Sequence, residues 1–216
     1  MSVKYATGRS LLLVFVLGSA AGLARADDEL SGPGRDRWQM PNQVLAALSL
    51  KKGDVVADIG AGTGYFTTRF AQAVGPKGKV YAVDIDGHVL EYLKKEARKQ
   101  NLNNVETLVS REDDPLLPSG SVNLAFFCDT VHEIADRVSF YRKVRQALKS
   151  NGRMAVIDSI PPPARQGGGI LIFGKQVSRD STVREAEQAG FRLVKEQKSL
   201  PRQFFLVFKK VNGTPR

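Results

Sequence analysis

A glycine-rich turn directly follows the first apolar run of the chain, and it constrains the fold more than any other feature. Residues 54–59 (DVVADI) lead into Gly60-Ala61-Gly62-Thr63-Gly64, and Phe66, Phe70 and Val74 then recur four residues apart. Glycine lets a ligand approach the backbone closely, and the N-terminus of a helix offers free N–H groups. The pattern therefore predicts a strand, a ligand-binding turn and a helix.

Strands and amphipathic helices alternate along the rest of the chain. The predicted strands are 54–59, 79–83, 105–109, 122–128, 154–157, 191–196 and 204–208, and the predicted helices are a short one from Pro41, then 63–74, 87–101, 136–148 and 178–189. This alternation predicts an open, mostly parallel sheet with helices on both faces. Only residues 197–203 separate the last two strands, which is too short for a crossover helix, so we expect an antiparallel hairpin there.

The spacing of the glycines restricts the kind of ligand. A dinucleotide-binding turn needs a small residue at the sixth position from Gly60, where this chain has Tyr65, and no Gly-Lys-Ser/Thr of a P-loop follows. Asp84 ends the second predicted strand, where a carboxylate can accept hydrogen bonds from both hydroxyls of a ribose. Asp58, beside the glycines, suits a ligand with an ammonium group. A tight turn without a ligand and a nicotinamide or other nucleotide site are the alternatives.

These motifs resemble the class I S-adenosylmethionine-dependent methyltransferase family. The likeness extends from about Trp38 to Phe208, and it is carried by VVADIGAGTGYF at 55–66, VYAVDID at 80–86, LPSGSVNLAFFCDTVHEI at 117–134 and LKSNGRMAVID at 148–158. The resemblance implies an α/β fold with a Rossmann-like, doubly wound, seven-stranded sheet, mostly parallel with an antiparallel last strand. It also implies S-adenosyl-L-methionine as the cofactor.

The resemblance assigns cofactor-binding roles to particular residues. Asp58 would hold the amino group, Asp84 would take the ribose hydroxyls, and Ile85 would flank the adenine. The acid that meets the adenine amino group would be Glu112 or Asp113. The complete set is Asp58, Gly60, Ala61, Gly62, Gly64, Asp84, Ile85, Glu112 and Asp113.

The acceptor should meet the residues that follow the fourth strand, beside the cofactor. Methyl transfer from a sulfonium mainly requires alignment, and a base is needed only where the acceptor has a proton to lose. His132 is the candidate general base, and Asp129 and Glu133 are candidates to orient it or to bind the acceptor. The structural alternatives are a hydrogen-bonded His132 at a helix start and a backbone-capping Asp129. Cys128 ends an apolar run and is expected in the core.

We expect no metal site. The chain has one cysteine and two histidines, which excludes an internal disulfide and any zinc site with two or more cysteines. A catechol-type magnesium site at Asp129 lacks partner ligands in the sequence. No Asn/Asp-Pro-Pro-Tyr/Phe motif follows the fourth strand, which argues against methylation of an exocyclic or amide nitrogen. The outline is nearest to small-molecule methyltransferases, including those that methylate a quinone ring carbon.

The chain has a net positive charge, and its basic residues are spread along the sequence. The net charge is +10, and it is +7 from residue 27 onward, where 29 Lys and Arg face 22 acids. Because acids interrupt the bases along the chain, we expect solvated helix faces, and nucleic acid is not the expected partner; a surface patch for a polyanion, such as nucleic acid or lipid headgroups, is the alternative. The expected partner is a small-molecule acceptor, and the expected state is a monomer or a weak dimer.

The first 26 residues match a secretory signal peptide. Lys4 and Arg9 precede an apolar stretch, and Ala24-Arg25-Ala26 predicts cleavage after Ala26. The apolar stretch is shorter than the ~20 residues of a membrane-spanning helix. We therefore expect a signal peptide at 1–26, a linker at 27–37, a methyltransferase domain at 38–216 and an exported, periplasmic protein. An uncleaved membrane anchor and a cytoplasmic protein that starts further downstream are the alternatives.

The sequence thus predicts an S-adenosylmethionine-dependent methyltransferase acting on a small or lipid-soluble acceptor. The loop at 160–172, with PPPARQGGG at 161–169, is interpreted either as a lid over the acceptor pocket or as a plain surface loop. Two alternative functions remain open. They are an exported, non-catalytic binding or accessory protein on the same fold, and an RNA methyltransferase.

Overall fold

The computed structural model describes residues 33–160 and 177–211. The predicted signal peptide at 1–26 and the segment 161–172 of the predicted lid lie outside the described residues, so both stay predictions. The chain divides between Arg37 and Trp38. Helix α2 (Pro33–Gln39) spans this division, so the segment predicted as a linker includes the start of a helix. The unit from Trp38 onward contains the sheet and the site.

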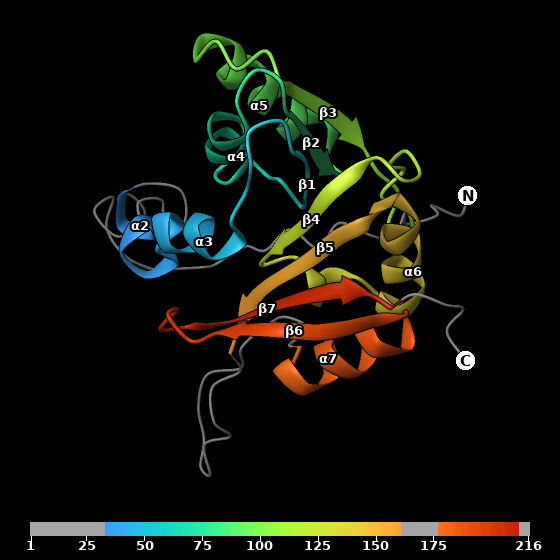
Figure 1. The fold of residues 1–216 in the computed structure, drawn as a ribbon. Coiled ribbons are helices and arrows are strands. Elements are labelled where there is room, and N and C mark those ends of the chain that lie inside the picture. Colours follow the sequence, from blue (N-terminus) through green and yellow to red (C-terminus); the bar gives the residue numbers. More distant parts are fainter. Residues whose placement is uncertain (1–32, 161–176, 212–216) are drawn as a thin grey trace, which may run out of the picture. The chain divides into compact units, whose positions relative to one another are not determined.

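Seven strands form one sheet in the order β3-β2-β1-β4-β5-β7-β6 (Figure 1). They are β1 (Val55–Ile59), β2 (Lys79–Asp84), β3 (Val105–Val109), β4 (Val122–Cys128), β5 (Leu148–Ser159), β6 (Phe191–Gln197) and β7 (Gln203–Lys210). The strands β1 to β5 are parallel to one another, and β7 is antiparallel to both β5 and β6. The predicted fold class and the predicted C-terminal hairpin are therefore confirmed.

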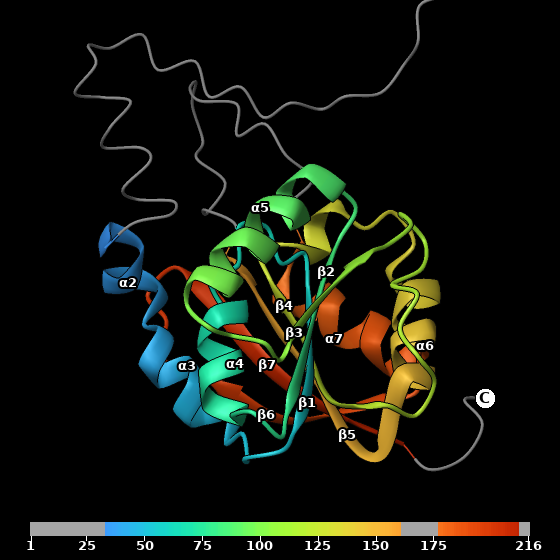
Figure 2. The same ribbon diagram turned by 90° about the horizontal axis from the view of Figure 1, so that it is seen from above.

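Helices cover both faces of this sheet (Figure 2). They are α3 (Pro41–Leu48), α4 (Thr67–Val74), α5 (Gly87–Lys99), α6 (Arg137–Ala147) and α7 (Arg179–Gln188), with the short 3-10 helix η1 (Val131–Glu133) between β4 and α6. Successive strand residues point to opposite faces. Val56 and Leu124 join the core under α3 and α4, whereas Ala57 and Ala125 join the core under α6 and α7. Helix α5 packs on the same face as α4, through Ala82 of β2.

Two element boundaries differ from the predictions. The helix predicted from residue 63 begins only at Thr67, because Gly62 and Gly64 have φ angles of 52° and 93°, which a right-handed helix excludes. The strand predicted at 154–157 runs from Leu148 to Ser159. Its start is marked by the pairing of Leu148 with Val122 of β4, and β7 pairs with it from Arg153 to its end. Within residues 33–160 and 177–211, no helix has the length and apolar character needed to cross a bilayer.

The buried hydroxyl of Tyr141 gives a stability prediction. Tyr141 of α6 is fully buried, its ring packs 5.9 Å from that of Phe127, and burial raises the pKa of its phenol. Its hydroxyl has no hydrogen-bond partner among the described residues. We expect Tyr141→Phe to leave the free energy of unfolding unchanged or to raise it by ~1–3 kcal/mol, because an unsatisfied buried hydroxyl is removed. Urea denaturation measures this.

Tyr141→Ala is the matched control for the ring itself. It removes the whole aromatic side chain from the core and should lower the free energy of unfolding by ~3–5 kcal/mol. A loss of more than about 1 kcal/mol on Tyr141→Phe would contradict the assignment, because it would mean that the hydroxyl makes a stabilising hydrogen bond.

Candidate functional site

The glycine turn is tied to the end of β2. The backbone N–H groups of Gly60 and Ala61 donate to the carbonyl oxygen of Val83 at 2.8 and 3.0 Å. The N–H of Gly62 donates to Oδ2 of Asp84 at 2.9 Å. The turn and the carboxylate at the end of β2 therefore form one unit at the carboxyl edge of the parallel strands, which is where open α/β sheets bind ligands.

Gly60 is also in direct contact with the residues that follow β4. Its φ is +75°, and Oγ1 of Thr130 lies 2.2 Å from the position that a Cβ on residue 60 would take. Thr130 is fixed there because its Oγ1 donates to the carbonyl oxygen of Cys128 at 3.0 Å. No side chain fits at position 60, so the cofactor turn and the predicted acceptor segment are packed against each other.

The surroundings of Asp84 combine a carboxylate with exposed apolar side chains. Oδ1 of Asp84 accepts the N–H of Asp86 at 3.1 Å, in addition to the bond from Gly62. A carboxylate can accept about four hydrogen bonds, which leaves capacity for the hydroxyls of a ribose. Ile85 is 63% exposed, and Val109, which pairs with Asp84 in register, is 53% exposed. Such an apolar surface beside the acid suits an adenine ring.

Asp58 lies beneath the turn. The residue is almost fully buried, and its Oδ2 accepts a hydrogen bond from Oγ1 of Thr67 at 2.6 Å. This bond joins the end of β1 to the start of α4. A buried carboxylate under the turn favours a positively charged group above it. This matches the amino-group role that the resemblance implies.

The two candidate adenine acids have different surroundings. Asp113 bonds to Nζ of Lys143 on α6 at 3.0 Å, and this contact lowers the pKa of Asp113. Lys143 also lies 3.4 Å from Asp114. Glu112 makes no ion pair within the described parts of the chain and is exposed. Of the two acids, Asp113 is thus engaged with α6, whereas Glu112 is not.

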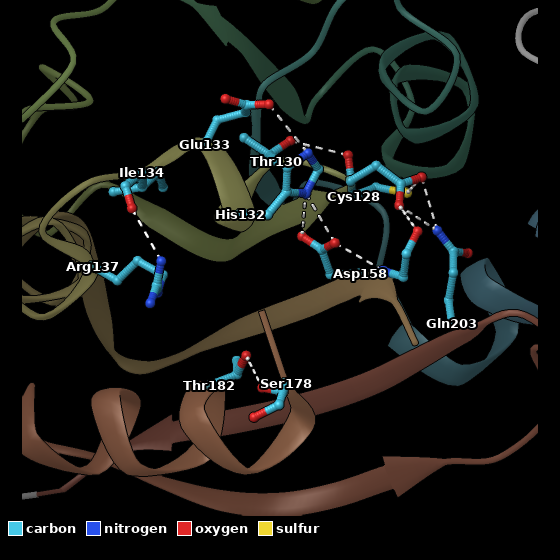
Figure 3. A network of polar contacts seen from close by, with 12 residues as sticks. Cys128, Thr130, His132, Glu133, Ile134, Arg137, Asp158, Ser178, Thr182 and Gln203 are labelled. Carbon is cyan, nitrogen blue, oxygen red and sulfur yellow. Dashed lines mark hydrogen bonds and ion pairs between the residues drawn. The ribbon is translucent and has the colours of Figure 1, made fainter. Parts of the chain in front are cut away.

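His132 forms a close pair with a buried acid from the next strand (Figure 3). Its Nδ1 lies 3.0 and 3.1 Å from the two carboxylate oxygens of Asp158, at the end of β5, and its Nε2 lies 3.4 Å from Oε1 of Glu133. Asp158 is 1% exposed and accepts the N–H of Ser159 at 2.8 Å. The hydrogen bond with Asp158 raises the pKa of His132, against the opposing effect of its partial burial. The charges of Asp158, Glu133 and Asp129 raise it further.

The pairing determines which ring nitrogen is available. When the Nδ1–H of His132 donates to Asp158, the neutral ring carries its lone pair on Nε2. The side chain is 25% exposed, so this nitrogen can exchange a proton with a bound molecule or with solvent. The exposed carboxylate of Glu133 can accept a hydrogen bond from Nε2 once it is protonated. An imidazole held in this way can accept a proton, which is the chemistry that the predicted role of His132 requires.

Asp129 belongs to a neighbouring polar network. Its φ is +51°, a left-handed conformation. Its two carboxylate oxygens accept hydrogen bonds from Nε2 of Gln203 at 2.7 and 2.8 Å. One of them also accepts a hydrogen bond from Oγ of Ser159 at 3.2 Å. Oε1 of Gln203 in turn accepts a hydrogen bond from Nε2 of Gln39 at 2.6 Å, and both glutamines are buried. Cys128 packs against the core, as predicted. Asp129 is therefore held by β5 and β7, close enough to His132 to raise its pKa.

Sequence reasoning missed Asp158, Gln39 and Gln203. A signal for Asp158 existed, because it follows the apolar run 154–157 directly, as Asp84 follows the run 80–83. The two glutamines carry no comparable signal, since only the packing of β7 beside β5 brings them to Asp129. Among residues 33–160 and 177–211, no three His, Cys, Asp or Glu side chains gather as metal ligands would.

S-adenosylmethionine fits the residues at this edge. No atom lies within 4 Å of the position that a Cβ on Gly62 would take, so the space above the turn is open. Asp84 can accept the ribose hydroxyls, Ile85 and Val109 can flank the adenine, and Asp58 attracts the amino group. The donor and acceptor types thus match each part of the molecule.

Known proteins that are similar to this chain are methyltransferases by name. A family profile described as "Methyltransferase domain" matches residues 50–198. The demethylmenaquinone methyltransferase of Listeria welshimeri is 23% identical over 126 residues, which are 58% of this chain and 52% of that protein. The ubiquinone/menaquinone biosynthesis C-methyltransferase of Francisella philomiragia is 27% identical over 121 residues, 56% of this chain and 48% of that protein. The chain spans about half the length of these curated relatives.

A solved structure matches more of the chain. The crystal structure of a SAM dependent methyltransferase from Aquifex aeolicus has a TM-score of 0.75 and 28% sequence identity. The match covers 88% of this chain and 98% of that one. The cofactor of this fold is therefore S-adenosylmethionine.

Gly62 tests where the cofactor lies. Alanine at a φ of +52° costs roughly 1–2 kcal/mol of stability, and its methyl group would project into the open space above the turn. We expect Gly62→Ala to weaken binding of S-adenosylmethionine at least ~10-fold in titration calorimetry, which corresponds to ~1.4 kcal/mol. Gly53→Ala is the matched control, because Gly53 has a φ of +87°, is equally open and precedes β1. It should bind the cofactor normally, and equal affinities would contradict the placement.

Asp158 should control the titration of His132. Because the pKa of His132 in the folded protein lies above its ordinary value, the Asp158 contact stabilises the fold below about pH 6.5. That stabilisation is lost as the pH rises through the folded-state pKa. We expect Asp158→Asn to lower the pKa of His132 in an NMR titration and to remove this pH dependence of unfolding.

Glu133→Gln is the control for the same measurement. The Glu133 side chain is 65% exposed and contributes less than Asp158 does to the raised pKa, so its removal should shift the titration less. A larger shift with Glu133→Gln than with Asp158→Asn would show that the buried pair is not the main cause.

Proposed function

Because the chain belongs to the methyltransferase-domain family, we propose that it transfers a methyl group to a ring carbon of a small, lipid-soluble hydroquinone. One observation carries this proposal: His132, paired with the buried Asp158, follows Thr130, which is packed on the cofactor turn at Gly60. This packing supports a proton-accepting nitrogen beside the place proposed for the methyl donor. The relatives named as quinone methyltransferases support the choice of acceptor.

The chemistry of the acceptor explains the need for this base. When bound, S-adenosylmethionine supplies a methyl group on a positively charged sulfur, ready for in-line displacement. A hydroquinone ring carbon becomes a good nucleophile when a ring hydroxyl gives up its proton, and Nε2 of His132 is placed to take it. Replacing ring hydrogen by methyl releases one proton in total, and the partly exposed imidazole can pass that proton to solvent.

Asp158 and Glu133 stabilise the protonated imidazole. Asp158 keeps Nδ1 protonated and the ring oriented, as the acid of a catalytic triad does. Glu133 lies beside the Nε2 that receives the proton. The carboxylates around His132 also disfavour an acceptor that carries its own carboxylate or phosphate at the reacting end. This charge pattern supports a neutral, phenolic acceptor.

The proposal is tested with a demethylated naphthohydroquinone that bears a short prenyl chain and is kept reduced. We expect methyl transfer to it, detected by mass spectrometry with methyl-deuterated S-adenosylmethionine. His132→Gln should lower kcat by ~10²–10⁴-fold and leave cofactor binding unchanged. His88→Gln, which changes the other histidine, on α5, should leave the rate unchanged.

The pH dependence separates a base from a merely structural histidine. The rate should rise with pH through the raised pKa of His132, because only the neutral ring accepts a proton. Asp158→Asn should move this rise to lower pH. Full activity of His132→Gln would refute the base assignment. Cofactor binding without turnover on hydroquinone, phenol and amine acceptors would favour a non-catalytic binding protein instead.

A further inference from the structure

Three cations lie side by side across the C-terminal part of the sheet. Arg153 of β5 pairs in register with Lys209 of β7, and Lys209 pairs in register with Arg192 of β6. Paired residues point to the same face, so the three side chains form a row. Lys195 of β6 extends it, because it pairs with Val207, two residues along β7 on that face. We call Arg153, Arg192, Lys195 and Lys209 the basic face.

In the described parts of the chain, no carboxylate neutralises the basic face. The one acid between residues 191 and 210 is Glu196, which pairs with Leu206 on the opposite face and forms an ion pair at 2.8 Å with Arg179 of α7. Within residues 33–160 and 177–211, none of the four basic-face residues forms an ion pair. Like charges opposite one another destabilise a sheet, so this row has an energetic cost in the isolated protein.

The contacts of the basic face leave its charge in place. Arg153 donates to the carbonyl oxygen of Leu48 at 2.7 Å and Lys195 to that of Ala47 at 3.5 Å, both at the C-terminal end of α3. These acceptors are neutral. Lys209 and Arg192 are exposed, and β6, which carries Arg192, is the edge strand of the sheet (Figure 1). Two unneutralised cations therefore face solvent at the edge.

The exposed apolar residues nearby are aliphatic. Val194 of β6 is 40% exposed, and Val211, directly after β7, is 43% exposed. No large aromatic side chain is among the exposed residues of the segment 191–211. Proteins that hold single-stranded nucleic acid use aromatic side chains as stacking platforms. Cations interspersed with aliphatic side chains instead match the headgroup region of a lipid bilayer.

We propose that the basic face docks on the surface of an anionic lipid bilayer. Each Lys or Arg close to such a surface strengthens binding roughly fivefold. Arg192 is the second residue of β6 and Lys209 the second-last of the antiparallel β7, so the exposed part of the row lies toward the amino ends of the parallel strands. Asp129, Asp158 and Glu133 lie at the opposite, carboxyl edge, where an anionic surface repels them. Docking on the basic face therefore leaves the site uncovered, and the inference does not depend on the acceptor proposed above.

The test is co-sedimentation of the full chain with vesicles of phosphatidylcholine alone or with 30% phosphatidylglycerol. We expect tighter binding to the anionic vesicles that weakens with salt. The double variant Arg192→Gln, Lys209→Gln should reduce partitioning onto anionic vesicles about 25-fold. The matched control is Lys94→Gln, Lys95→Gln, which removes the same charge from two exposed positions of α5 and should bind nearly as the unchanged protein does.

Several outcomes would overturn the proposal. Equal losses in the two double variants would mean that only net charge matters. No loss in either would mean that another part of the chain binds the vesicles. Tighter binding of a 20-nucleotide RNA, abolished by Arg192→Gln, Lys209→Gln, would make the face a nucleic-acid surface. Aggregation of that variant with unchanged vesicle binding would mean that the cations only protect an edge strand.

Discussion

The contact between Thr130 and the backbone of Gly60 holds the two halves of the site together. It requires a glycine for two independent reasons: the φ of +75° is strained for any other residue, and a Cβ would overlap the threonine. Through this contact, the turn predicted to bind the cofactor is packed on the connection that carries His132. The family's in-line chemistry needs its reactants held in a fixed geometry, and this packing supplies it.

The carboxyl edge of the sheet gathers acids, and each of the three central ones has a different partner. Asp58 accepts from Thr67, Asp158 pairs with His132, and Asp129 accepts from Gln203. These partners keep buried or half-buried carboxylates satisfied in a small volume. Their summed charge stabilises a cation at this edge, either the sulfonium of the cofactor or the protonated His132. The basic face gives the same domain a region of opposite sign.

Much of the fold could be predicted from local patterns. The strand β4 and the two strands of the C-terminal hairpin follow from apolar runs and from the short connection between them. The start of α4 could not, because Tyr65 and Phe66 have helix-compatible side chains while Gly62 and Gly64 adopt positive φ angles. The full length of β5 could not either. Its first part, 148–152, is mostly polar and lies outside the pairing with β7, and it is joined to the sheet where Leu148 pairs with Val122 of β4.

Residue types and their spacing were enough to determine the parallel sheet and the glycine turn. They also located the acids at the ends of β1 and β2 and the histidine after β4. All of these features depend on neighbours close in sequence. The partners of those residues were decided by tertiary structure. Asp158 reaches His132 across 26 positions, and Gln203 reaches Asp129 across 74. The row from Arg153 to Arg192 likewise exists only in the strand order β5-β7-β6. Contacts between strands depend on register and order, and apart from the short connection of the β6–β7 hairpin no local pattern encodes which strands become neighbours.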